Sequence, residues 1–286
     1  MADILERHDA HIHLFEGGYR ASLTARPGLT VDEAALYASL MKDHNVREAL
    51  IVGYAAHEWC RDNTAHLAKM AAAHAWVRPV SFVHLDRSPP TRYDLELLRD
   101  QKFVGLSFYV FGEESRTALS RMPDELWKFA IDHRWLISVN SRGTDWGAWQ
   151  PILSRHPELR VLVSHLGLPP RQRVAPSADE ARRAIGDVLG LAQFKSVRVK
   201  LSGFYALTDP GHEYPHRAAW PYVEALAQDF GIDRLLWASD FSPHLDWLSF
   251  PQTFGLFDAM LFLGDAARGR ILGANLAKLL GEVQSS

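Results

Sequence analysis

The sequence predicts one (β/α)8-barrel domain of the α/β class spanning residues 1–286, and three observations support it. Short apolar runs alternate with amphipathic stretches along the whole chain, which is typical of a parallel sheet with helical crossovers. There are eight strand-like runs, and a barrel of this kind needs about 250 residues. Nearly every run ends in a polar or ionisable residue, as expected where strand ends converge on one mouth.

The expected strands are apolar on both faces, as buried parallel strands require. Their predicted ranges are Arg7–Leu14, Ala49–Tyr54, Arg78–Leu85, Phe103–Val110, Leu136–Ser141, Arg160–His165, Val197–Ser202 and Arg234–Ser239. An open doubly wound sheet could also hold eight such units. Its polar strand ends would spread along one edge, whereas a barrel gathers them, and we therefore favour the barrel.

The expected helices lie between these strands and show apolar residues near helical spacing. Their predicted ranges are Val31–Asp43, Glu58–His74, Tyr93–Asp100, Asp124–His133, Trp146–His156, Ala178–Gln193, Trp220–Phe230, Gln252–Leu263 and, last, Ile271–Leu280. Three long irregular stretches follow strands one, six and seven, at Glu16–Thr30, Leu166–Pro176 and Ala206–Pro221. Loops of this length are often lids or binding loops.

Composition narrows the class of partner. The net charge of −3 does not indicate a nucleic-acid surface. The single cysteine, Cys60, cannot form an intrachain disulfide, which indicates a cytoplasmic protein. We see no signal peptide and no apolar run near the roughly 18 residues of a membrane span.

Motifs for a serine nucleophile elbow, a phosphate loop and a dinucleotide turn are also missing. A small-molecule substrate is expected, and the outer helices would permit a homodimer.

His11 and His13 are the sharpest chemical signal. They lie two residues apart in a predicted strand, so both side chains point to one face. Imidazole suits zinc and related divalent ions. The alternative interpretation is that His11 and His13 are interior histidines that form hydrogen bonds and bind no metal.

His165 and Asp240 each end another buried strand. A carboxylate at such a place is costly to bury unless it is paired or metal-bound, although a helix N-cap or a salt bridge would also explain it. We expect His11, His13, His165 and Asp240 to meet at the barrel mouth. Asp240 would act as general base on a water, and the histidines would bind a metal or polarise a carbonyl.

At this point the chain resembles a known family. The matching stretches, in order, are Asp9-Ala10-His11-Ile12-His13, His156-Pro157 with Val163-Ser164-His165-Leu166-Gly167-Leu168-Pro169, Val199-Lys200-Leu201-Ser202-Gly203, Leu236-Trp237-Ala238-Ser239-Asp240-Phe241-Ser242-Pro243 and Ile271-Leu272-Gly273-Ala274-Asn275-Leu276-Ala277. They resemble the amidohydrolase superfamily, in particular the branch of lactonases that includes 2-pyrone-4,6-dicarboxylate hydrolase and L-fuconolactonase. The resemblance covers nearly the whole chain.

The resemblance implies a barrel whose site is made by His11, His13, His165 and Asp240. It implies hydrolysis of a cyclic ester, with Asp240 activating water. One divalent metal, zinc foremost, is expected on these four residues. A metal-free mechanism is expected as the alternative, because some relatives in this branch work without a metal.

Two departures from the family pattern bear on substrate. Asn140 stands where many members have a metal-binding histidine, so a second metal is not expected. Ser107 stands where several relatives bind a substrate carboxylate with arginine. Arg142 and Lys200 could replace that arginine, although Arg142 could also be a solvated loop residue and Lys200 an interior one. The full set of predicted substrate-binding residues is Arg142, Lys200, Asn140, Tyr109, His84, His244 and Ser107.

Three functions are compatible with these residues. The first is hydrolysis of a small anionic or sugar-acid-like lactone. The second is metal-dependent, non-oxidative decarboxylation of an aromatic acid, carried out by relatives with a similar mouth. The third is ligand binding without catalysis on a degenerate barrel, which Asn140 and Ser107 keep open.

Overall fold

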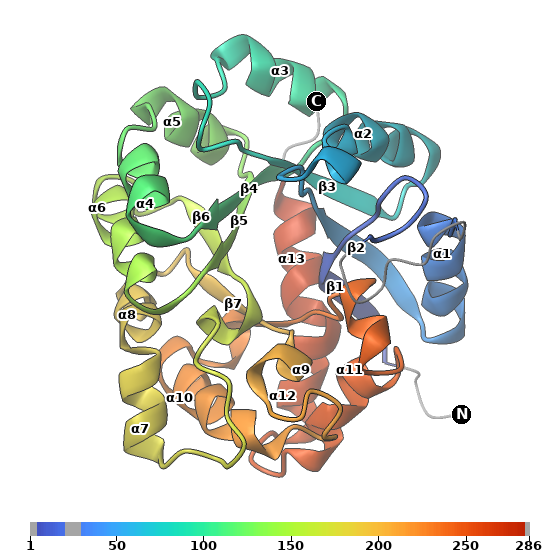
Figure 1. The fold of residues 1–286 in the computed structure, drawn as a ribbon, viewed down its shortest axis with the longest axis vertical. Helices are drawn as coiled ribbons and strands as arrows, with labels where there is room; N and C mark the ends of the chain where they lie inside the picture. Colours follow the sequence, from blue (N-terminus) through green and yellow to red (C-terminus); the bar gives the residue numbers. More distant parts are fainter. Residues whose placement is uncertain (1–4, 21–29, 284–286) are drawn as a thin grey trace.

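The computed structural model describes residues 5–20 and 30–283 and shows eight parallel strands in sequential order in one sheet (Figure 1). The strands are β1 Arg7–Ile12, β2 Val46–Val52, β3 Val77–Phe82, β4 Gly105–Val110, β5 Leu136–Ser141, β6 Arg160–Val163, β7 Arg198–Leu201 and β8 Leu235–Trp237. Each lies within three residues of its predicted start, and the predicted barrel is confirmed.

The sheet closes where the segment after β8 returns to β1. Ile12 and Phe241 form a parallel bridge. The backbone N–H of Asp240 donates to the carbonyl oxygen of His11 at 2.9 Å. Barrel closure therefore brings the end of the last strand against the first-strand histidines, although more than 220 residues separate them in the sequence.

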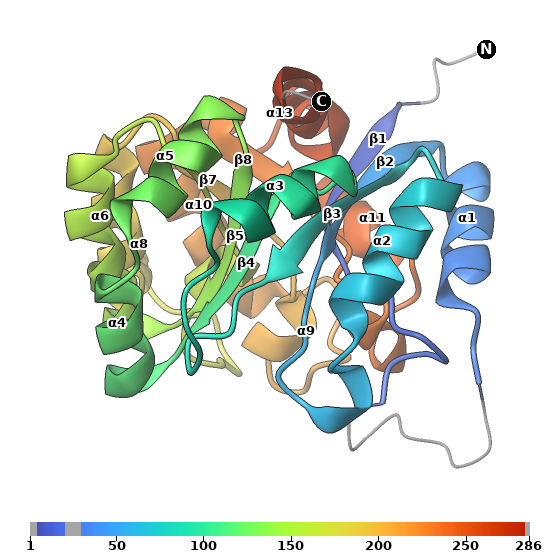
Figure 2. The ribbon, with the colours of Figure 1, turned by 90° about the horizontal axis from the view of Figure 1, so that it is seen from above.

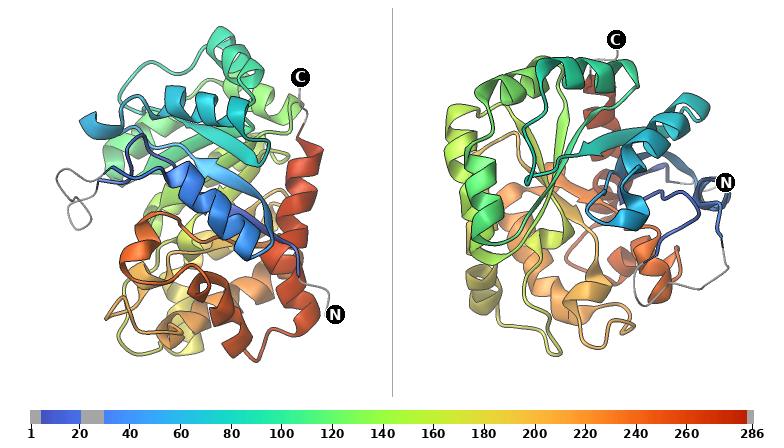
Figure 3. Two further views of the ribbon diagram at one scale, coloured as in Figure 1. Left: turned by 90° about the vertical axis from the view of Figure 1, so that its right-hand side faces the viewer. Right: turned by 45° about the horizontal axis from the view of Figure 1, so that its top comes forward.

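Helices surround the strands (Figures 2 and 3). They are α1 Glu33–Asp43, α2 Asn63–Ala73, α3 Arg92–Asp100, α4 Gly112–Ser120, α5 Asp124–Asp132, α6 Gln150–Arg155, α7 Ala178–Ala184, α8 Gly186–Gly190, α9 Phe204–Leu207, α10 Trp220–Phe230, α11 Gln252–Gly255, α12 Asp265–Gly269 and α13 Asn275–Glu282. Three of these, α4, α9 and α12, were not predicted. Helices α9 and α12 have only four and five residues, and α4 begins with a glycine, which lowers helix propensity.

Several predicted helices are broken in the structure. The one expected over Ala178–Gln193 divides between Ala184 and Gly186, where glycine lowers helix propensity. The one expected over Gln252–Leu263 is two short turns, Gln252–Gly255 and Leu256–Ala259. These breaks make the outer helices shorter than predicted, and the strand order is unaffected.

Helix α13 lies across the end of the barrel where the strands begin. Arg78 in β3 donates to the carbonyl oxygen of Leu280 at 3.3 Å, and Arg160 in β6 donates to Glu282 at 2.6 Å. Figure 3 shows α13 running beside the start of β1. In the helical turn just before α13, a Cβ atom built on Gly273 would lie 2.2 Å from the carbonyl oxygen of Glu6, so this turn packs closely against the residue that precedes β1. The open end is therefore the opposite one, where the strands finish.

The core consists of apolar strand residues and large aromatic rings beneath the helices. Trp127, Trp135, Trp149 and Trp237 are completely buried. Within the described residues, no helix combines the length and the apolar composition needed to cross a bilayer. Of the expected loop Glu16–Thr30, residues 21–29 lie outside the described part.

Candidate active site

A cavity of about 630 Å³ opens at the carboxyl ends of the strands. Aromatic and hydroxyl-bearing side chains form most of its wall. The lining residues are His13, Phe15, Tyr19, Arg20, Tyr54, His57, Trp59, Tyr109, Asn140, His165, Leu168, Gly203, Tyr205, Ala206, Asp240 and Pro243. This size and this mixture of rings with a few polar groups suit a small cyclic ligand.

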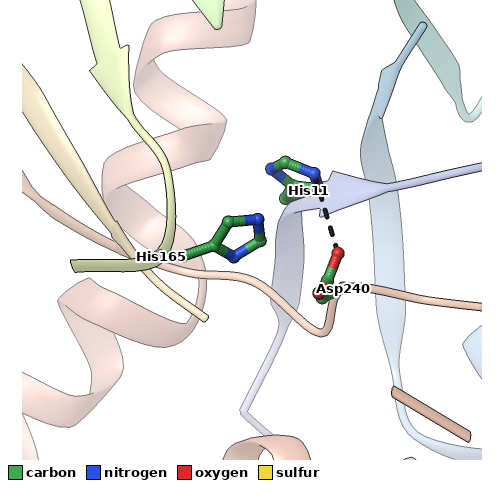
Figure 4. A group of neighbouring side chains, drawn as sticks. All are labelled: His11, His165 and Asp240. Carbon is green, nitrogen blue, oxygen red and sulfur yellow. Dashed lines mark ion pairs between the residues drawn. The ribbon is translucent and has the colours of Figure 1, made fainter. Parts of the chain in front are cut away.

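Four predicted residues meet at the inner end of this cavity, where His13, His165 and Asp240 line it and His11 is buried behind them. The Nε2 atoms of His11 and His13 are 3.2 Å apart, and Asp240 Oδ1 lies 3.7 Å from the first and 3.9 Å from the second. The rings of His11 and His165 are 4.7 Å apart between centroids. Figure 4 shows His11, His165 and Asp240 pointing toward one another from β1 and from the segments after β6 and β8. The expected convergence of these side chains is therefore present.

Backbone geometry directs two of these side chains. His165 and Asp240 both have left-handed φ angles, of 53° and 60°, which cost a non-glycine residue about 1–2 kcal/mol. Gly203 makes room for the His165 ring, since a Cβ atom at Gly203 would lie 2.7 Å from its Nδ1. Such strain is often found at functional sites.

Burial shifts the pKa values of the cluster. Loss of solvent lowers the pKa of His13 to about 4 and that of His165 to about 3, and it lowers the pKa of His11 well below its usual value. The histidines are therefore neutral at pH 7 and offer lone pairs. Burial raises the pKa of Asp240 to about 7, although the hydrogen bond from Tyr205 opposes this rise. A carboxylate with a pKa near 7 suits a general base.

Asp240 is further oriented by Tyr205, a residue outside the predicted set of site residues. The hydroxyl of Tyr205, in α9, donates to Asp240 Oδ2 at 2.6 Å. That bond leaves Oδ1 facing His11 and His13. The only sequence signal for Tyr205 was its place a few residues after the seventh strand.

The donor set fits one divalent ion. Ligand atoms about 2.0–2.2 Å from a tetrahedral zinc lie roughly 3.3–3.6 Å from one another, close to the spacings among His11, His13 and Asp240. His13 Nδ1 donates to the carbonyl oxygen of Val52 at 2.7 Å, which leaves Nε2 as an acceptor, as a metal-bound histidine requires. His11, His165 and Asp240 form a second possible set, with ligand atoms within 4.8 Å.

Lys200 works against such an ion. It is fully buried in β7, and its Nζ lies 2.6 Å from Ser138 Oγ and 3.2 Å from His11 Nδ1. When Lys200 is protonated, its ammonium group only donates, so it occupies the Nδ1 lone pair and leaves the His11 proton on Nε2, the atom that would bind a metal. Burial lowers the pKa of Lys200 to about 7, and the nearby carboxylates of Asp240 and Asp9 oppose this shift.

Asp9 lies in β1, where the barrel closes against the segment after β8. Its carboxylate accepts hydrogen bonds from Tyr37 Oη at 2.8 Å and from the backbone N–H of Ser239 at 2.9 Å. Asp9 therefore joins β1 to the segment that carries Asp240.

Two predicted substrate-binding residues line the cavity, Tyr109 and Asn140. The others lie elsewhere. Arg142 lines a neighbouring cavity with Arg171 and stacks over the ring of Phe111 at 5.8 Å. Ser107 is completely buried within β4.

The two histidines that were predicted to bind substrate, His84 and His244, also lie outside the lining of the cavity. His84 packs edge-on against Phe82 and lies 3.8 Å from Asp86. His244 is completely buried beside Phe241 and Phe250. The reason is the same for both: position after a strand does not specify the side-chain direction of a loop residue. The cavity is instead lined by the cation of Arg20, which the sequence pattern did not single out.

Comparison with known proteins identifies relatives of this chain and structures that share its fold. The chain is 27% identical over 235 residues to L-fucono-1,5-lactonase of Burkholderia ambifaria, which covers 75% of this chain and 74% of that protein. A zinc-bound amidohydrolase from Burkholderia multivorans superposes with a TM-score of 0.75 at 21% identity, over 96% of this chain and 99% of that one.

Two further structures share the fold. A probable 2-pyrone-4,6-dicarboxylic acid hydrolase from Acinetobacter baumannii, with citric acid bound, has a TM-score of 0.73 at 18% identity, over 96% and 99% of the two chains. The 2,6-dihydroxybenzoate decarboxylase from Rhizobium has a TM-score of 0.61 at 14% identity, over 96% and 98%. At these identities the structures establish the fold alone. The family model described as amidohydrolase matches residues 8–281, and the chain belongs to the amidohydrolase family.

Proposed function

We propose that this protein hydrolyses the ring ester of a small, sugar-acid-like lactone, with Asp240 as the general base. The observation that carries the proposal is the position of this carboxylate. It is buried at the floor of a ligand-sized cavity, with Oδ2 held by Tyr205 and Oδ1 directed at His11 and His13. The sequence similarity to an L-fucono-1,5-lactonase supports a lactone as substrate.

The reaction would begin with water beside Asp240 Oδ1. The carboxylate takes one proton as the water oxygen bonds to the ester carbonyl carbon, and the carbonyl oxygen becomes an oxyanion. If Ser202 Oγ donates to His165 Nδ1, which is 2.9 Å away, His165 presents Nε2–H to the cavity and can stabilise that oxyanion. A divalent ion held by His11, His13 and Asp240 would, when bound, act as a Lewis acid on the carbonyl.

The ring then opens at its ester bond. The tetrahedral intermediate collapses, the bond from the carbonyl carbon to the ring oxygen breaks, and Asp240 returns its proton to that oxygen. The product is a hydroxy acid, and the carboxyl group of Asp240 is a carboxylate again. This proton cycle suits a group whose pKa is about 7.

The wall of the cavity supports a polyhydroxylated ring as the substrate. The hydroxyl groups of Tyr19, Tyr54 and Tyr109 and the amide of Asn140 can bond to ring hydroxyls. The rings of Phe15 and Trp59, with centroids 4.8 Å apart, offer an apolar surface. Arg20 can meet a carboxylate or another anionic substituent.

A substrate panel tests this proposal. The purified protein is assayed against five- and six-membered sugar lactones, 2-pyrone-4,6-dicarboxylate and 2,6-dihydroxybenzoate, with proton release and carbon dioxide measured separately. We expect proton release with at least one lactone and no carbon dioxide from any compound, and the Asp240→Asn variant gives the uncatalysed background. Release of carbon dioxide would identify a decarboxylase, and saturable binding without turnover would identify a binding protein.

A further inference from the structure

A buried carboxylate outside the histidine cluster has no part in the reaction proposed above. Glu33 is the first residue of α1 and is 4% exposed. Its neighbour Asp32 already caps the helix, with Oδ1 accepting from the backbone N–H of Ala35 at 2.9 Å. Glu33 is therefore not needed as the cap, and its side chain points into the protein.

Three donors surround the Glu33 carboxylate. Oε2 accepts from the backbone N–H of Phe15 at 2.7 Å, and Oε1 accepts from the backbone N–H of Tyr19 at 2.9 Å. The hydroxyl of Ser242 also donates to Oε1. Two donors thus come from the loop after β1, and the third comes from the segment after β8, two residues beyond Asp240.

This arrangement shapes one wall of the cavity. The loop turns back on itself, with Gly18 N–H donating to the carbonyl oxygen of Phe15 at 3.1 Å. Gly18 has a φ of +95°, and a Cβ atom there would lie 3.2 Å from that of Val31, so the turn rests on the residues before α1. The turn presents the Phe15 and Tyr19 rings to the cavity, with their centroids 5.7 Å apart.

The energetics favour the loop conformation that satisfies the carboxylate. A carboxylate in a buried place is strongly unfavourable unless donors surround it. Backbone N–H groups cannot be supplied from elsewhere without moving the chain. Glu33 therefore stabilises one placement of the β1 loop and, through Ser242, one placement of the β8 segment.

We propose that Glu33 is a positioning residue that couples the substrate-binding wall of the cavity to the segment that carries Asp240. Its role in turnover rests on the proposed function, whereas the coupling of the two segments does not. Because two of its three bonds go to the wall, its loss raises KM more than it lowers kcat.

The first experiment tests the coupling without any substrate. Hydrogen exchange of the peptides that contain residues 15–20 and 240–245 is compared in wild type, Glu33→Gln and Asp32→Ala. The glutamine amide nitrogen cannot accept, so Glu33→Gln leaves one donor unpaired and is expected to speed exchange in both peptides by at least about tenfold. Asp32→Ala is the matched control, because it removes the cap of the same helix and affects α1 alone. Unchanged exchange in either peptide of Glu33→Gln, or an equal change in Asp32→Ala, overturns the proposal.

The second experiment uses a lactone that the substrate panel identifies. Glu33→Gln is expected to raise KM about tenfold and to lower kcat about threefold, whereas Asp32→Ala changes neither. Ser242→Ala removes only the link to the β8 segment and is expected to lower kcat about threefold with KM unchanged. If Glu33→Gln does not fold, Ser242→Ala tests the coupling in its place. An unaltered kcat in Ser242→Ala would then refute the coupling. If no lactone is turned over, the proposed function fails, while the exchange experiment still decides the role of Glu33.

Discussion

The two halves of the barrel mouth differ in the kind of residue that each strand end supplies. On the side of β1, β6, β7 and β8, ionisable groups are buried and lie within a few ångströms of one another, as His11, Lys200 and Asp240 do. On the side of β4 and β5, the strands supply the neutral groups of Tyr109 and Asn140. The first half can move protons or hold an ion, and the second can only recognise a ligand.

This difference shows that charged groups are buried where other charged or polar groups lie close to them. A single charged group is costly in an apolar interior, whereas a group of opposite charges and lone pairs offsets part of that cost. Lys200 is an example. The carboxylates of Asp240 and Asp9 favour its charged form, and its Nζ donates a hydrogen bond to Ser138. We therefore expect substitutions in the first half to change kcat, metal affinity or pH dependence, and substitutions in the second half to change KM.

The largest effect is expected for Asp240→Asn. The amide cannot accept a proton from water, and general base catalysis contributes about 10²–10⁴-fold to rates of this kind. We expect kcat to fall about 1000-fold, measured by proton release on an active lactone. Circular dichroism and thermal melting should match wild type. Near-normal turnover would remove Asp240 from the mechanism.

The next effect concerns Lys200→Met, measured as zinc affinity by calorimetry. Methionine has a similar length but no charge, so it removes both the repulsion of a cation and the donor to His11 Nδ1. His11 can then donate from Nδ1 to Ser164 Oγ, which is 3.4 Å away. We expect zinc to bind about tenfold more tightly. Lys128→Met, an exposed site on α5, is the control, and equal affinity in both variants would show that Lys200 does not act on the ion.

A smaller effect is expected for Tyr205→Phe, measured as the pH dependence of kcat/KM. The base acts when deprotonated, so activity should fall as the pH drops below the Asp240 pKa of about 7. The hydroxyl of Tyr205 lowers that pKa by stabilising the carboxylate. Its loss should raise the pKa, move the acid limb to higher pH and reduce activity at pH 7 about fivefold. A shift toward lower pH would contradict this assignment.

The smallest effects should separate Asn140 from Arg142. Asn140→Ala removes a polar group from the cavity wall, and we expect KM to rise about fivefold with kcat nearly unchanged. Arg142→Ala alters only the neighbouring cavity, and we expect both constants to stay within about twofold of wild type. Steady-state kinetics on one lactone compares the pair. A larger loss in Arg142→Ala than in Asn140→Ala would mean that the substrate extends past Leu168, which lines both cavities.

Sequence reasoning succeeded for the four residues at the centre of the barrel mouth. His11, His13, His165 and Asp240 were placed together because parallel strands end at one mouth. It did less well in the loops. Arg142 directly follows β5 and His244 lies four residues beyond Asp240, yet Arg142 lines a different cavity and His244 is completely buried beside aromatic rings. Loop side chains take directions that depend on contacts from distant segments, which periodicity does not reveal.

The sequence by itself determined the barrel, its strand order and the four residues at its centre, because strand and helix patterns are local and parallel strands have one common direction. Only the tertiary structure decided that Tyr205 holds the base, that Lys200 faces His11 and that Glu33 joins two loops. Each of these contacts joins residues far apart in the chain. Their partners are selected by closure of the barrel and by the need to satisfy buried polar groups, and neither leaves a pattern in the sequence.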